Sequence, residues 1–532
     1  MRVRKEVKIL VGILVLAIFL RGVNLARNFE GDEIYHATLA ENVVNGRGLK
    51  TLDFSSRQDR GRMTEYTIPK RNPYRQGIDH PPFDVLLFTL FAGLPFSQEI
   101  SLRLLPFFGG ILAIIFTYLI GKKIFNERVG LISSFLESIS TYHLFHSSFI
   151  LESDAIISFL VPLSFFLYVR WKEREGRRIF YLMGISLGLI VLTKITGVFF
   201  LGFILFYELL RKKFSEIGIL LIVVGLMLGI WGIYDHFVLT DVGWINGVLK
   251  HGLPKIEGGI DLSQRAYKIV YSTGILMEEL TTPLCVLFLL AFVSVVKDVK
   301  ISGKLNVKKT LHRYDVMLLL WILLNSIYFL NGGGDPQRYF SIAVPFLFIL
   351  VAKFISEFKW RKDYIVTASL LFLLIGYFFQ INDYQFYTYL VYQSNLMTLI
   401  MWSLPFIFLF LYLVKNFREL TVSILLGAYL GASLYFILFS TATWPVAISQ
   451  ATTYISQEKN ANFIVSKSWY VLESSMYYDW VKDGRLDKRY FRIPLEEIKK
   501  FDEENKENCE EKNVRGYPLV FLCKNFPKGS GI

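Results

Sequence analysis

The stretch ILVGILVLAIFLRGVNLARNFEGDEIYHATLAENVV (residues 9–44) joins an apolar segment to a polar one that opens with two adjacent acids. The apolar part follows the basic MRVRKEVK, and no small-residue cleavage site comes after it. We therefore interpret it as an uncleaved first membrane span and not as a signal peptide. Asp32 and Glu33 then stand where the chain leaves the membrane, at the predicted start of a helix.

Apolar residues dominate the rest of the chain and come in blocks. Of its 532 residues, 53% are hydrophobic and 19% are charged, whereas a soluble domain is roughly 45–50% apolar and about 25% charged. Each block has about the length of the ~20 residues that cross a bilayer. The sequence predicts an all-α polytopic membrane protein of about 13 helices, near residues 9–26, 104–121, 129–147, 155–169, 179–193, 195–210, 217–234, 275–296, 314–331, 339–352, 364–381, 396–414 and 420–440.

Basic residues mark every second gap between these blocks. Cytoplasmic loops carry an excess of Lys and Arg, so we predict a cytoplasmic N-terminus, and the odd number of spans then leaves the tail outside. These loops explain the net charge of +13, which requires no nucleic acid as a partner. The polar segments of chemical interest all fall in the outer gaps, which predicts one extracytoplasmic site at the cell membrane.

The chain is predicted to have two domains. Residues 1–440 are expected to form a transmembrane domain, which includes a first outer loop at 27–103, and residues 441–532 a small extracytoplasmic α/β domain. Alternating apolar and polar residues in NFIVSKSWYVLES and YPLVFLCKN predict strands in that second domain. Cys509 and Cys523 lie there and can pair if the tail is outside the reducing cytosol.

The first outer loop is predicted to contain two short helices. Apolar residues at three- to four-residue spacing over 32–45 predict an amphipathic helix at the membrane surface, ended by Gly46 and Gly48. Pro81 and Pro82 introduce an apolar helix at 83–94. The arginine-rich SSRQDRGRMTEYTIPKRNPYRQG between them is predicted to be a loop.

Acids gather at the outer ends of the predicted spans. Asp32 and Glu33 are, in the simplest interpretation, a helix cap and a first-turn acid, both favourable against the helix dipole. Glu152 and Asp154 stand at the mouth of a span, where the alternatives are capping, pairing with a cation or binding a ligand. Glu137 lies inside a span, and the sequence identifies no partner for it.

Cations stand in other outer segments. Lys194 in LTKITG either places a fixed charge at the membrane surface or marks a turn. Arg338 follows three glycines in NGGGDPQRYF; arginine suits a phosphate because it stays charged and donates bidentately, and snorkelling is the alternative. For Arg103, at the end of the span 104–121, snorkelling is the preferred interpretation.

Taken together, these motifs resemble the GT-C superfamily of integral-membrane glycosyltransferases. The resemblance is carried by the acidic pair after the first span, by HPP at residues 80–82, by RLLP…GKKIFNERVGLISS, by LTKITG and by RYF…P. The nearest branch is that of the protein O-mannosyltransferases and the transferases that add aminoarabinose to lipid A. It covers residue 21 to about residue 210, is thin through 211–330 and returns at 335–350.

The resemblance implies an inverting enzyme that moves a sugar from a polyprenyl- or dolichyl-phosphate donor to a protein, lipid or glycan on the outer face of the membrane. By match to the family motif, Asp32 is the catalytic carboxylate that accepts the proton of the acceptor hydroxyl. Cations would be aimed at the departing lipid phosphate; His80 stands where some relatives carry lysine. The implied substrate-binding residues are Glu33, Tyr35, His80, Asp154, Lys194, Arg338 and Tyr339.

Three alternatives stay open from the sequence. No cofactor is implied with certainty; a divalent metal would be held by Asp79 and Glu152, with Asp154 nearby, although no compact ligand motif is present. A multispan transporter or lipid flippase would explain the many spans, but the chain lacks the duplicated halves typical of transporters. A relative that transfers an oligosaccharide is the third. Sugar, carrier and acceptor are not identified.

Overall fold

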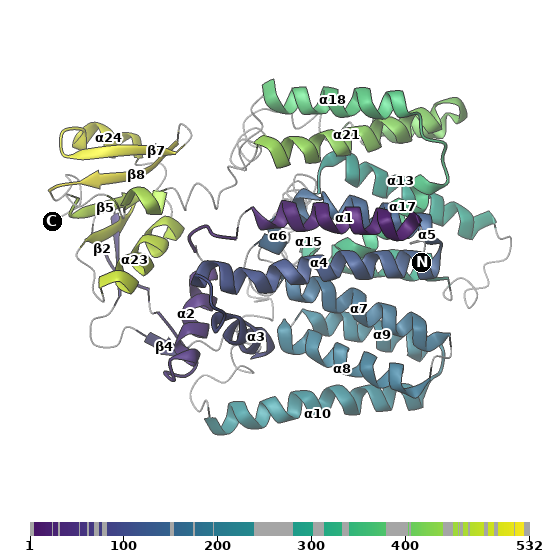
Figure 1. The fold of residues 1–532 in the computed structure, drawn as a ribbon, viewed down its shortest axis with the longest axis horizontal. Helices are drawn as coiled ribbons and strands as arrows, with labels where there is room; N and C mark the ends of the chain where they lie inside the picture. Colours follow the sequence, from purple (N-terminus) through teal and green to yellow (C-terminus); the bar gives the residue numbers. More distant parts are fainter. Residues whose placement is uncertain are drawn as a thin grey trace, which may run out of the picture. The chain divides into compact units, whose positions relative to one another are not determined.

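Helices make up most of the structure, a computed structural model of the 532-residue chain (Figure 1). The structure describes residues 5–23, 25–29, 32–52, 54–60, 63–68, 74–76, 82–148, 154–173, 176–194, 196–238, 280–301, 313–331, 340–378, 403, 406–439, 451–455, 457, 461–466, 469–483, 488–493, 498–514 and 517–525.

The described helices range in length from 8 residues in α6 to 27 residues in α4. In chain order they are α1 (Lys5–Gly22), α2 (Asp32–Val44), α3 (Pro82–Ala92), α4 (Gln98–Ile124), α5 (Glu127–Ser138), α6 (Thr141–Ser148), α7 (Asp154–Lys172), α8 (Arg177–Thr193), α9 (Gly197–Leu210), α10 (Phe214–Val238), α13 (Thr282–Ile301), α15 (Tyr314–Asn331), α17 (Val344–Ser356), α18 (Lys362–Phe378), α21 (Arg418–Phe439), α23 (Trp469–Asp483) and α24 (Ile498–Asn505), with a 3₁₀ turn η2 (Lys415–Phe417).

The structure divides into two compact units. The helical unit consists of Met1–Val23, Asp79–Asp84 and Leu104–Ser440, and the mixed unit consists of Asn24–Ile78, Val85–Arg103 and Thr441–Ile532. The mixed unit therefore combines the first long loop, the first turns of α4 and the C-terminal segment.

The helical unit contains rods of membrane-spanning length. Among the described residues, four helices are long and apolar enough to cross a membrane, and shorter apolar helices accompany them. This agrees with the predicted multi-pass, mainly helical protein, while the count of thirteen spans stays a prediction. The four segments are Gln98–Ile124, Asp154–Lys172, Phe214–Ile233 and Lys415–Tyr435.

The predicted span 129–147 is not one helix, and this prediction was wrong. The chain breaks after Ser138 into α5 and α6. The carbonyl oxygens that the end of α5 leaves open are taken by distant side chains: Tyr429 Oη donates to Leu136 O at 2.8 Å, and Arg21 Nη1 donates to Ser138 O at 3.1 Å. Because unpaired backbone groups are costly in an apolar surrounding, these two donors permit the break.

Glycines allow two helices of this unit to approach closely. α18 and α21 run side by side (Figure 1), and a Cβ added at Gly427 would collide with the carbonyl oxygen of Ile365. Gly431, one turn further on, meets the backbone of Ser369 in the same way. Ser369 Oγ also donates to Gly427 O at 2.9 Å, so the GAYLG segment forms a small-residue helix interface.

The mixed unit is built on a six-stranded sheet with the order β2-β3-β6-β5-β8-β7. Neighbouring strands pair antiparallel except β5 and β6, which are parallel. A two-stranded antiparallel sheet joins β1 to β4. The strands are β1 (Lys50–Leu52), β2 (Ser55–Arg60), β3 (Met63–Thr67), β4 (Tyr74–Gln76), β5 (Phe463–Ser466), β6 (Arg489–Arg492), β7 (Cys509–Val514) and β8 (Tyr517–Cys523).

The arginine-rich stretch of the first loop forms β2, β3 and β4, so the prediction of a loop was wrong there. β3 pairs with β6 of the C-terminal segment, with Thr64 opposite Arg492 and Tyr66 opposite Tyr490. Arg489 Nε also donates to Glu65 Oε1 at 2.8 Å. The partner strand lies more than four hundred residues away in the sequence, and no local pattern announces such a pairing.

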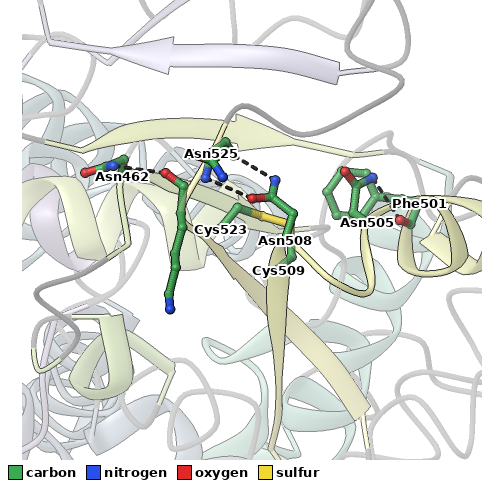
Figure 2. Close-up of a disulfide and its surroundings, with 8 residues drawn as sticks. Asn462, Phe501, Asn505, Asn508, Cys509, Cys523 and Asn525 are labelled. Atoms are coloured by element: carbon green, nitrogen blue, oxygen red, sulfur yellow. Dashed lines mark hydrogen bonds between the residues drawn. A yellow bond between two sulfur atoms is a disulfide. The ribbon is translucent and has the colours of Figure 1, made fainter.

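The strand predicted in YPLVFLCKN is present as β8, whereas NFIVSKSWYVLES is a strand only over β5, Phe463–Ser466, and its second half belongs to the helix α23, so the strand prediction was wrong there. Cys509 and Cys523 form a disulfide across the hairpin of β7 and β8 (Figure 2). Beside it, Asn508 Nδ2 donates to Asn525 O at 2.9 Å, and Asn525 N donates back to Asn508 Oδ1 at 3.0 Å. The apolar core of the sheet comprises Val465, Phe491, Ile493, Phe501, Phe521 and Cys523.

The close approach of α18 and α21 gives a first prediction. We expect Gly427→Ala to lower the free energy of unfolding of the full chain by about 1–3 kcal/mol, and with it the melting temperature. The reason is that the added methyl group collides with backbone and not with a flexible side chain. The matched control is Gly229→Ala in α10, where a Cβ would meet nothing within 4 Å. Equal melting temperatures for both variants in detergent would contradict the tight helix contact.

Candidate functional site

The acidic pair opens α2, as predicted. Asp32 is the first residue of the helix, and Gly46 and Gly48 follow its end with positive φ angles of 69° and 78°. Ile34, at the predicted apolar spacing, is fully buried. The structure describes the backbone of Asp32, and it describes the side chain of Glu33, which is fully buried.

Glu33 is held by two arginines. Arg103 on α4 forms a fork with it: Nε donates to Oε1 at 3.1 Å and Nη2 donates to Oε2 at 2.9 Å. Arg27 Nη2 adds a third bond to Oε1 at 2.9 Å. Charge-assisted bonds of this kind are strong, and these three occupy both oxygens of the carboxylate, which leaves it little capacity to bind a substrate hydroxyl.

Arg103 is fully buried, so the preferred interpretation of a snorkelling side chain was wrong. α4 begins at Gln98 and not at 104, which places Arg103 in the second turn and away from the helix end. Its remaining donors bind carbonyl oxygens of the segment before α2, those of Leu25 and Asn28 at 3.0 Å each and that of Arg27. One signal in the sequence pointed to Arg103 as a buried partner: Glu33 is an acid at the membrane edge for which the sequence identifies no cation.

Tyr35 of α2 belongs to a small group of aromatic side chains. Its ring meets the ring of His36 edge-on at 5.3 Å, and His36 lies 5.2 Å from Phe88 of α3. Tyr35 is partly exposed, whereas His36 is buried. The contact fixes α2 against α3 inside the mixed unit.

In the helical unit, Lys194 and Asp154 form a buried ion pair. Lys194 Nζ donates to Asp154 Oδ1 at 2.6 Å, and the exposed fractions of the two side chains are 8% and 0%. Asp154 is the first residue of α7, and Lys194 follows the last residue of α8. The structure thus brings together two predicted site residues that lie 40 positions apart in the sequence.

Two glycine-dependent approaches position this pair. Gly197 begins α9 in direct contact with Ile190 of α8, where a Cβ would collide, and its N–H donates to Lys194 O at 2.9 Å. Of the two interpretations of Lys194, the marking of a turn agrees with this bond and with the end of α8 at Thr193 and the start of α9 at Gly197. On the other side, Gly109 of α4 packs on the carbonyl group of Ala155, which directly follows Asp154.

Glu137 has partners that the sequence did not reveal. His143 Nε2 lies 3.5 Å from Glu137 Oε1, and His143 Nδ1 lies 2.8 Å from Arg21 Nη2. All three side chains are buried and come from α5, α6 and α1. They connect these helices at the break after Ser138.

Five of the predicted site residues lie outside the described residues: Asp79, His80, Glu152, Arg338 and Tyr339. Among the residues that the structure does describe, no group of three or more His, Cys, Asp or Glu side chains is arranged to hold a metal ion. The two proposed metal ligands, Asp79 and Glu152, therefore stay predictions.

Comparisons with known proteins bear on this arrangement. Residues 79–233 match the family model for dolichyl-phosphate-mannose-protein mannosyltransferase. No curated protein matches the chain by sequence. Among solved structures, ArnT from Cupriavidus metallidurans in the apo state is similar with a TM-score of 0.58 and 13% identity, over 96% of this chain and 97% of that one.

The same ArnT bound to undecaprenyl phosphate is similar with a TM-score of 0.57 and 13% identity, again over 96% and 97% of the two chains. The chain therefore has an ArnT-like fold. The predicted resemblance to GT-C glycosyltransferases of the O-mannosyltransferase and aminoarabinose-transferase branch is confirmed.

The buried Arg103 gives a second prediction. We expect Arg103→Ala to destabilise the chain by about 3–5 kcal/mol, because it leaves the Glu33 carboxylate and three backbone carbonyls short of donors. The control is Lys122→Ala, whose pair with Glu127 at 2.7 Å is exposed and should contribute at most about 1 kcal/mol. Denaturant unfolding of the purified chain measures both. A loss for Arg103→Ala no larger than the control would contradict the burial.

Proposed function

We propose that the chain is an inverting glycosyltransferase that moves a sugar from a polyprenyl- or dolichyl-phosphate donor to a protein, lipid or glycan acceptor on the outer face of the membrane. Support comes from the mannosyltransferase family model over residues 79–233 and from the ArnT-like fold. The observation that carries the proposal is that Arg27 and Arg103 bind Glu33, and from it we infer that the neighbouring Asp32 is the acid that performs the chemistry.

In this proposal Asp32 acts as the general base. Its carboxylate accepts the proton of the acceptor hydroxyl while the hydroxyl oxygen bonds to the anomeric carbon from the face opposite the leaving group. The bond between that carbon and the phosphate oxygen of the carrier breaks, which releases the lipid phosphate and inverts the anomeric configuration. The position of Asp32 at the first residue of α2 favours its ionised form, because the helix dipole stabilises a negative charge there.

Lys194 is proposed to stabilise the departing lipid phosphate. Its ammonium group is a compact positive charge with three donors, and the bond to Asp154 holds it just after the end of α8. Arg338 and His80 are proposed as further cations for the same phosphate, His80 being only partly charged near neutral pH. Tyr35 and Tyr339 are proposed to contact the substrate, and Glu33 to shape the acceptor side.

The lipid-linked donor sets the proposed location of the chemistry. A polyprenyl chain lies in the bilayer and presents its phosphate at the surface, so the site belongs at the outer mouths of the helices, with the N-terminus cytoplasmic and the C-terminal segment outside. The disulfide between Cys509 and Cys523 supports a non-reducing compartment for the mixed unit. The division into a catalytic membrane domain, 1–440, and an outer domain, 441–532, remains part of the proposal.

The base assignment gives a third prediction. Transfer from a radiolabelled polyprenyl-phosphate sugar should fall about 10²- to 10⁴-fold in Asp32→Asn, because the amide cannot accept the proton. The matched control is Glu41→Gln, an acid on the same helix, which should keep its activity. Full transfer by Asp32→Asn at equal expression would remove Asp32 from its role. Solute movement in proteoliposomes without any transfer would favour a transporter instead.

The cation assignment gives a fourth prediction. We expect Lys194→Gln to lower kcat about 10²-fold, as for the loss of one group that stabilises developing charge. Lys172→Gln is the control: Lys172 Nζ also binds a buried acid, Glu208, at 2.5 Å, but at the opposite end of α7 from Asp154. Both variants lose a buried pair, so stability falls in both, and kcat per folded molecule should fall only in Lys194→Gln. An equal effect on kcat would exclude the proposed role.

A further inference from the structure

The backbone just before α2 is bound by side chains of the C-terminal helix α23. Ser474 Oγ donates to Phe29 O at 2.6 Å, and Phe29 N–H donates to Tyr478 Oη at 2.8 Å. These partners are 445 and 449 positions apart in the sequence. Ser474 and Tyr478 are one helical turn apart on α23, so a single face of that helix binds both polar groups of one residue.

Both hydroxyl groups are themselves fixed by further bonds. Tyr478 accepts from Phe29, so its own proton goes to Glu99 Oε1 on α4, at 3.0 Å. Removal of the phenol from water, followed by the Glu99 charge, raises the pKa of Tyr478, which keeps that proton available for donation. Ser474 Oγ accepts from Thr452 Oγ1 at 2.9 Å and donates to Phe29. In both chains of hydrogen bonds, from Phe29 N–H through Tyr478 to Glu99 and from Thr452 through Ser474 to Phe29 O, the donor and the acceptor of each bond are therefore defined.

The other side of the same segment is bound by Arg103. The carbonyl oxygens of Leu25, Arg27 and Asn28 accept from its guanidinium group, which also stacks over the Phe29 ring at 5.0 Å. Phe29 is fully buried, and Tyr477 of α23 meets its ring edge-on. The peptide groups from 25 to 29 are thus specified from α4 on one side and from α23 on the other.

We propose that Ser474 and Tyr478 are positioning residues for the catalytic carboxylate, which makes the C-terminal helix α23 a working part of the transfer site. They fix both polar groups of the Phe29 backbone, three residues before the first residue of α2, and in this proposal they thereby fix where α2 begins. The inference rests on the proposed role of Asp32. Apolar side chains would suffice to pack α23 against the loop, whereas hydroxyls on both groups of one peptide residue specify its register and orientation.

The expected consequence is a loss of turnover with little loss of donor binding. A displacement of about 1 Å in a catalytic group reduces the rate about 10²-fold, so kcat of the double variant Ser474→Ala and Tyr478→Phe should fall by about that factor, with KM for the polyprenyl-phosphate sugar nearly unchanged. Ser474→Thr keeps the hydroxyl and should restore most of the activity lost in Ser474→Ala. A fall in kcat that Ser474→Thr does not restore would overturn the role of the Ser474 hydroxyl.

The chain offers matched controls. Ser475 is equally buried, and its hydroxyl donates within α23, to Val471 O at 2.7 Å. Tyr490 is a buried tyrosine whose hydroxyl donates to the carboxylate of Asp479 on α23. Ser475→Ala and Tyr490→Phe remove the same groups from the same unit, so they should leave kcat unchanged. If they lower kcat as much as the double variant, the effect is general destabilisation and the proposal fails.

Two further measurements separate this inference from the proposed function. Hydrogen exchange of the full chain in detergent should accelerate in a peptide covering 25–37 for the double variant and not for the controls; unchanged exchange there overturns the positioning role without any activity assay. In an Asp32→Asn background the double variant should cause no further loss, because residues that act through one group are not additive. If the activity losses of Asp32→Asn and of the double variant multiply in the combined variant, the inference is overturned.

Full transfer by Asp32→Asn alone would instead overturn the assignment of Asp32 as the base. Hydrogen exchange would still decide the role of α23 in that case.

Discussion

The buried guanidinium of Arg103 is the group on which the start of α2 depends. It has five N–H donors, and all five have acceptors: both oxygens of Glu33 and the carbonyl oxygens of Leu25, Arg27 and Asn28. Removing a charge from water costs several kcal/mol, and only complete pairing of this kind offsets it. One side chain consequently holds the backbone at Leu25, Arg27 and Asn28 together with the carboxylate of Glu33 at the start of α2.

Two buried acids of the helical unit are also paired with a cation from another segment. Asp154 is bound by Lys194, and Glu208 accepts from Tyr168 at 2.8 Å and from Lys172 at 2.5 Å. In a helical unit with little polar surface, an ionised side chain persists only where a second helix supplies its partner. Each pair therefore also specifies which helix ends meet, and the glycine contacts at 109 and 197 let the backbones come close enough for this to happen.

The mixed unit is assembled from segments that are distant in the sequence. β3 of the first loop pairs with β6, and α23 binds the backbone before α2 and the first turn of α4. The C-terminal segment is thus joined to the first loop through the sheet and through the segment that leads to Asp32. A mechanism that uses Asp32 consequently depends on residues at both ends of the chain, and their contribution is structural and specific.

The sequence by itself determined the apolar rods and the helices at α2 and α3, and it offered a turn at LTKITG and a pairing of the two tail cysteines as possibilities. These features depend on local hydropathy, on Gly and Pro and on the spacing of a few residues, and a reader of the sequence sees all of that at once. It also placed Asp32 and Glu33 together at a helix start. It did not distinguish their roles, because Arg103 stands 70 positions from Glu33.

Tertiary structure alone decided which charges meet and which strands pair. Arg103 has the sequence position of a membrane-edge side chain, but α4 begins at Gln98 and Arg103 is buried. The break after Ser138 requires donors from Arg21 and Tyr429, which are distant from it in the sequence. The pairing of β3 with β6 likewise joins backbones that share no local signal. The reason is the same in each case. Burial and hydrogen-bond pairing depend on two or more segments at once, so the sequence of one segment alone does not predict which other segment it contacts.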